Sequence, residues 1–72
     1  MTAQKTQEVR QEIARLNMAA DGESDHAAVF EAMAENATNP WKAAGYRVNA
    51  KAHRERAAKI AEAAQRLEDG LD

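Results

Sequence analysis

Apolar and small residues near the start of the chain recur at alternating spacings of four and three positions. Such spacing lines one face of an α-helix, because a helix completes a turn about every 3.6 residues. We predict a helix over about residues 2–20, closed by Gly22, since glycine readily takes the left-handed conformation that ends many helices. Its apolar stripe consists of Thr2, Thr6, Val9, Ile13, Leu16 and Ala20.

A second helix is predicted after Gly22, with Ser24 or Asp25 as its N-terminal cap and the sequence ENATNP as its end. Its narrow apolar face holds Val29, Phe30 and Met33. Asn39 and Pro40 then repeat a helix start signal, because proline is favoured at the first helical position.

The segment PWKAAG predicts a single helical turn over Pro40–Ala44, closed by Gly45. We expect an extended link over residues 46–48, followed by Asn49 as the cap of the last helix, over about residues 50–69. The apolar stripe of this helix repeats the spacing of the first and consists of His53, Ala57, Ile60, Ala64, Leu67 and Leu71.

The shared spacing of the first and last stripes would let them form an antiparallel seam, with large residues of one helix against alanines of the other. Each stripe covers fewer than three heptads, which is short for an independent coiled coil. We therefore predict an all-α fold: a single domain over residues 1–72, forming a small three-helix bundle with an extra single-turn helix near Pro40–Ala44. The seam could equally join two copies of the chain into a homodimer.

Composition makes this core thin, because alanine supplies 18 of the 72 residues. A core with few large side chains leaves a monomer marginally stable, so self-association or a partner would help. A chain of this length buries only about 60% of its unfolded surface and has little room for a substrate pocket. We therefore expect no enzyme and assign no catalytic residues.

Motifs for metals and cofactors are missing from the sequence. The absence of cysteine excludes disulfides and thiolate metal sites. His26 and His53 fall in different predicted helices, without a further ligand at a characteristic spacing. The stretch DGESDH starts like a calcium loop, but His26 stands where glycine is required and Ala32 where glutamate is required. We predict no metal and no cofactor, and the lack of a long apolar run favours a cytoplasmic protein without a membrane segment.

Charge is distributed unevenly along the chain. The net charge is −2, yet residues 1–40 sum to −4 and residues 41–60 sum to +5. Such asymmetry bears on partners rather than on fold. The acidic half could even imitate a nucleic-acid backbone and occupy a basic channel on a target.

The only tryptophan and the only tyrosine, Trp41 and Tyr46, lie at the start of the basic segment. One interpretation is structural, with Trp41 covering the open end of the bundle. Another is that both aromatics, flanked by Lys42 and Arg47, anchor a partner, since aromatic residues and arginine are enriched at binding hot spots. Stacking on nucleic-acid bases is a third.

We favour a small helical regulator or inhibitor that docks on an acidic groove of a larger protein. By analogy of type, short alanine-rich chains with acidic and basic halves occur among the regulators of phages and mobile elements. The alternative is a nucleic-acid-binding protein that uses the same basic segment, although an isoelectric point near 5.6 argues against strong phosphate binding. A self-assembling structural piece is a further option. The predicted partner-binding residues are Trp41, Lys42, Tyr46, Arg47, Arg54, Arg56 and Lys59.

Overall fold

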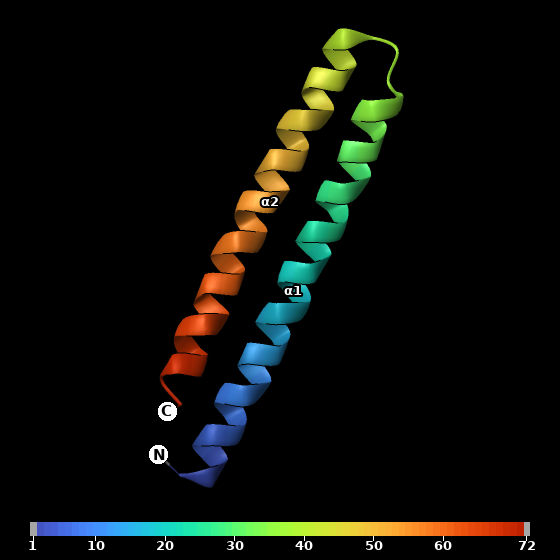
Figure 1. Cartoon of the computed structure of the whole chain (residues 1–72). Coiled ribbons are helices and arrows are strands. Elements are labelled where there is room, and N and C mark those ends of the chain that lie inside the picture. The colour runs from blue at the N-terminus through green and yellow to red at the C-terminus, as the bar shows by residue number, and fades with distance from the viewer. Residues whose placement is uncertain (1, 72) are drawn as a thin grey trace.

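The computed structural model describes residues 2–71, which form two long α-helices packed as an antiparallel hairpin (Figure 1). Helix α1 spans Ala3–Asn36 and helix α2 spans Pro40–Asp69. Residues 37–39 connect the helices at one end of the hairpin, and the start of α1 lies near the end of α2 at the other. The molecule is a rod of 56 × 13 × 11 Å.

Both helices begin at side-chain caps that satisfy free backbone N–H groups. The hydroxyl of Thr2 accepts a hydrogen bond from the backbone N–H of Lys5 at 3.1 Å. The side-chain oxygen of Asn39 accepts from the N–H groups of Trp41 at 2.8 Å and Lys42 at 3.4 Å, with Pro40 at the first helical position. The predicted helix start at Asn39 and Pro40 is therefore confirmed.

The prediction of three main helices is wrong, because two of the three predicted breaks lie inside continuous helices, and only the break at ENATNP is present. Gly22 lies within α1 and Gly45 within α2, and no glycine of the described residues has a positive φ angle. Asn49, expected to cap the last helix, is an interior residue of α2. The expected single-turn helix near Pro40–Ala44 is simply the first turn of α2. A glycine inside a helix costs about 1 kcal/mol relative to alanine, and the long seam between the helices offsets that cost.

The seam repeats every seven residues, and alanine occupies one position of three consecutive repeats in α1 and of four in α2. These alanines are the buried core of the described residues. Their small side chains leave room for the two helix backbones to approach closely, since interaxial distance depends on the side chains at the contact. The buried positions are Ala20, Ala27 and Ala34 of α1 and Ala43, Ala50, Ala57 and Ala64 of α2.

Two contacts define how the helices are aligned. Glu23 lies opposite His53, and Phe30 lies opposite Tyr46 with ring centroids 6.3 Å apart. Ala27 falls between Glu23 and Phe30 and is therefore level with Ala50. The seam extends beyond the two predicted stripes, because α1 and α2 continue through the predicted breaks at Gly22 and Gly45.

The two predicted stripes do meet in this antiparallel seam. The α1 stripe is buried or half-buried from Thr6 onward, whereas Thr2 is exposed and serves as the cap. The α2 stripe is likewise buried or half-buried from His53 to Leu71. Large residues at the open end thus supply the apolar area that the alanine layers lack. Within residues 2–71, neither helix combines the length and hydropathy needed to cross a membrane.

Candidate functional site

Trp41 lies in the first turn of α2 and leaves 87% of its surface exposed. The interpretation that it covers the open end of a bundle is wrong, because α2 continues straight past it and no third helix is present in the described residues. At this end of the hairpin, the α2 residues that pack in the seam are Ala43 and Tyr46. Trp41 therefore contributes little to the core of the isolated hairpin.

Val48 extends the exposed apolar surface that begins at Trp41. It lies seven residues further along α2, on the same side of the helix, and is 69% exposed. Ala44 and Gly45 lie between them on that side and are also exposed. We call Trp41, Ala44, Gly45 and Val48 the outer patch. It faces away from α1, since the seam occupies the opposite side of α2.

The predicted partner-binding residues do not lie on one face of α2. Lys42 and Arg47 are exposed and flank the outer patch, whereas Tyr46 is half-buried in the seam against Phe30. Lys59 is exposed about 16 Å further along the helix than Val48.

Arg54 and Arg56 point to opposite sides of α2 and each lies near a carboxylate of α1. Arg54 donates to Glu31 through two parallel hydrogen bonds, from Nε at 2.8 Å and from Nη2 at 2.5 Å. Nη1 of Arg56 lies 3.9 Å from Oε2 of Glu23. These two arginines therefore partly neutralise acidic groups of their own hairpin, while the remaining predicted cations make no ion pair within residues 2–71.

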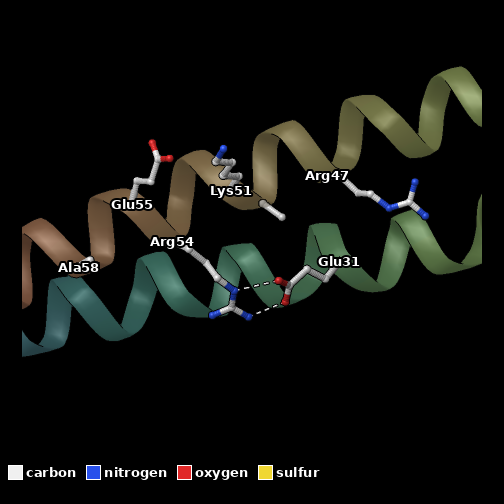
Figure 2. A pocket seen from close by; sticks show the side chains of 7 residues that line it. Glu31, Arg47, Lys51, Arg54, Glu55 and Ala58 are labelled. Carbon is white, nitrogen blue, oxygen red and sulfur yellow. Dashed lines mark hydrogen bonds and ion pairs between the residues drawn. The ribbon is translucent and has the colours of Figure 1, made fainter.

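The Arg54–Glu31 pair borders a shallow groove along one side of the hairpin (Figure 2). Arg47 borders the same groove, which is also lined by Ala50 and Ala58. In Figure 2, Arg54 and Glu31 point toward one another across the helices, and the charge-assisted hydrogen bond lowers the pKa of Glu31 below its ordinary value. The groove is open to solvent, and its charged lining also includes Lys51 and Glu55.

On the other side of the seam, the helix pairing brings together three side chains with metal-binding atoms: Glu23, His26 and His53. Oε2 of Glu23 is hydrogen-bonded to Nδ1 of His53 at 2.5 Å. The His26 ring meets the His53 ring edge-on, with centroids 5.2 Å apart. One potential ligand atom from each of the three residues lies within 4.8 Å of the other two.

Aromatic packing holds His53 in this cluster. Its ring stacks on Phe30, with centroids 5.5 Å apart and planes 13° from parallel. The pKa of Glu23 lies below its ordinary value, chiefly because of the hydrogen bond with His53, with a smaller effect of the positive charge of Arg56. The cluster is thus a polar layer in an otherwise mostly apolar seam, with Glu23 and His53 half-buried and His26 exposed.

Sequence reasoning placed the two histidines in separate helices and assigned them no common role. The spacing of Glu23 and His26, three residues apart on one helix, was a usable signal because such residues are neighbours on a helix surface. His53 could be added only with the alignment of the helices, which depends on α1 continuing through Gly22. No family model, curated protein or solved structure matches this chain.

Proposed function

We propose that this chain is a protein-binding module whose outer patch docks on a larger protein and regulates or inhibits it. The exposure of Trp41, 87% beside a seam that is complete without it, is the observation that carries the proposal. Burying such a side chain on a partner would recover apolar area that the hairpin itself does not use. Tryptophan is also the residue type most enriched at binding hot spots, together with tyrosine and arginine.

The charges around the outer patch indicate the chemistry of the partner. Lys42 and Arg47 flank Trp41 and Val48, and Lys51 follows one turn later; none of these cations is paired within the described residues. An apolar pocket with an acidic rim would complement this arrangement, because opposite charges around an interface steer association and suppress wrong partners. Arg54 and Arg56, already engaged with α1, would contribute less.

Photo-crosslinking tests the proposal directly. A photoreactive benzoylphenylalanine is placed at Trp41 in one variant and at Met18 in a control variant, in the native host. Met18 is a suitable control because it is also a large, 73% exposed apolar residue, but it lies on α1. We expect a defined crosslinked protein from position 41 and not from position 18. The same products from both positions would contradict the proposal.

Binding of the purified crosslinked partner then measures the contribution of the patch. Trp41→Ala should weaken the affinity by roughly 30-fold or more, the loss typical of a hot spot, whereas Met18→Ala should leave it unchanged. Equal affinity of Trp41→Ala and the wild-type protein would refute the proposal.

A parallel anisotropy titration against labelled duplex DNA and single-stranded RNA separates the nucleic-acid alternative. Binding that falls steeply with added salt would show that the basic segment contacts phosphates and would overturn the protein-binding proposal. An interface centred on a buried tryptophan should keep most of its affinity for a protein partner at physiological salt, because apolar burial is not screened.

A further inference from the structure

We propose that Glu23, His26 and His53 form a binding site for one divalent transition-metal ion, of the kind that zinc represents, between α1 and α2. The two histidines of the chain and one carboxylate meet here, although His53 lies thirty residues from Glu23 in sequence. The site is independent of the outer patch and of the function proposed for it.

The ligand set matches the preferences of zinc-like metals. Imidazole nitrogens and a carboxylate oxygen bind zinc at about 2.0 to 2.2 Å, and two histidines with one glutamate can hold it with a further position open to water. Ligand atoms around a tetrahedral ion lie roughly 3.3 Å apart. The three candidate atoms already lie within 4.8 Å of one another, so small side-chain rotations bring them to an ion.

The position of the cluster in the seam supports a role beyond packing. Polar residues at seam positions cost stability, although a single pair can fix the alignment of two helices. Glu23 and His53 alone would serve that purpose. His26 adds a third potential ligand from the edge of the seam, where neither packing nor alignment requires a histidine.

The surroundings of His53 favour binding for a second reason. Stacking on Phe30 restricts the orientation of the imidazole, so less conformational entropy is lost when the ring binds an ion. The side chains of His53 and Glu23 remain 19% and 24% exposed, and His26 is exposed, so an ion can enter from solvent and keep a water ligand.

Arg56 lies beside the cluster, and its positive charge opposes the binding of a cation. Its Nη1 lies 3.9 Å from Oε2 of Glu23, but its side chain is 60% exposed and can turn toward solvent. Removing this positive charge should strengthen metal binding, because the guanidinium repels a nearby cation and attracts the same Glu23 carboxylate that would bind the ion. Arg56→Gln is therefore a variant with a predicted gain of affinity, roughly 3- to 10-fold.

Zinc titration of the full chain tests the site. Isothermal titration calorimetry should give one zinc ion per chain, and excess zinc should raise the melting temperature by roughly 5 to 10 °C. His26→Gln and His53→Gln should each lower the affinity at least about tenfold. Asp25→Asn is the matched control, because it removes a carboxylate beside His26 that is not part of the cluster, and it should bind zinc as the wild-type protein does.

Proton NMR supplies a readout that needs no substitution. The chain has two histidines, so zinc should shift the ring signals of both. Both shifts should stop changing when one zinc ion has been added per chain. Failure of either histidine signal to respond, one zinc per two chains, or an unchanged affinity in both histidine variants would each overturn the proposal. Weaker binding in Arg56→Gln than in the wild-type protein would also contradict it.

Discussion

Ala27 is the most enclosed residue of the seam, with 0% of its surface exposed, and it lies level with Ala50 of the opposite helix. Ala27→Leu adds three carbon atoms at this point. If the helices could separate, burying these atoms would stabilise the hairpin by about 2 kcal/mol, at about 0.8 kcal/mol for each carbon. If the close approach of the backbones is fixed by the neighbouring alanine layers, overpacking should instead destabilise it by about 1 to 3 kcal/mol.

We expect the second result, because alanines occupy the equivalent position in three consecutive repeats of α1 and four of α2. A leucine at one layer would force several adjacent layers apart, and each would lose contacts. Ala27→Leu should therefore lower the melting temperature by roughly 5 to 20 °C.

Ala28→Leu is the matched control, since Ala28 is the next residue of α1, is exposed and has the same helical environment. Leucine and alanine differ little in helix propensity, so this variant should melt within a few degrees of the wild-type protein. Melting is followed by circular dichroism, with sedimentation equilibrium to verify that both variants keep the same association state. A melting temperature of Ala27→Leu equal to or above that of Ala28→Leu would refute the close packing of the alanine layers.

Two further predictions concern helix ends and charge. Asn39→Ala should destabilise the hairpin by about 1 kcal/mol, because the N-terminal cap of α2 is lost. Asn49→Ala is the same exchange in the interior of α2 and should be neutral or slightly stabilising. If urea denaturation showed Asn49→Ala to be the less stable variant, the helix would start at Asn49. The pKa of Glu31 is lowered by Arg54, so the stabilisation from this ion pair should be present above the ordinary glutamate value of 4.5 and disappear as pH falls through the lowered value. The small difference in melting temperature between the wild-type protein and Glu31→Gln should accordingly vanish in acid, and a difference that grows below this pH would contradict the assignment.

The apolar spacing was a reliable guide to the helices, whereas the local break signals were not. The stripe ending at Ala20 and the stripe starting at His53 were visible in the sequence, as was the helix start at Asn39. Gly22 and Gly45 were misjudged because glycine tolerates helical angles as well as left-handed ones, and only the pairing with a second helix decides between them. Continuing the spacing across these glycines would have revealed the buried alanines at every seventh position.

The candidate sites show the same dependence on long-range pairing. The charge and residue types around Trp41 pointed to a binding surface, but its exposure follows from the straight course of α2. Conversely, the pairing of Arg54 with Glu31 and the meeting of His26 with His53 depend on alignment between residues more than twenty positions apart. A one-dimensional pattern contains no direct information on such contacts.

The short connection at residues 37–39 has a consequence for the order in which the hairpin assembles and opens. Ala34 and Ala43 can meet after closure of a very small loop. Each further layer then forms next to one already in place. Most of the conformational entropy lost on loop closure is therefore lost in this first step. Tension applied to the two chain ends would separate the helices layer by layer, starting from the end opposite the connection. Opening would begin among the leucine and isoleucine layers, reach Glu23 and His53 at mid-length, and come last to the turn beside Trp41.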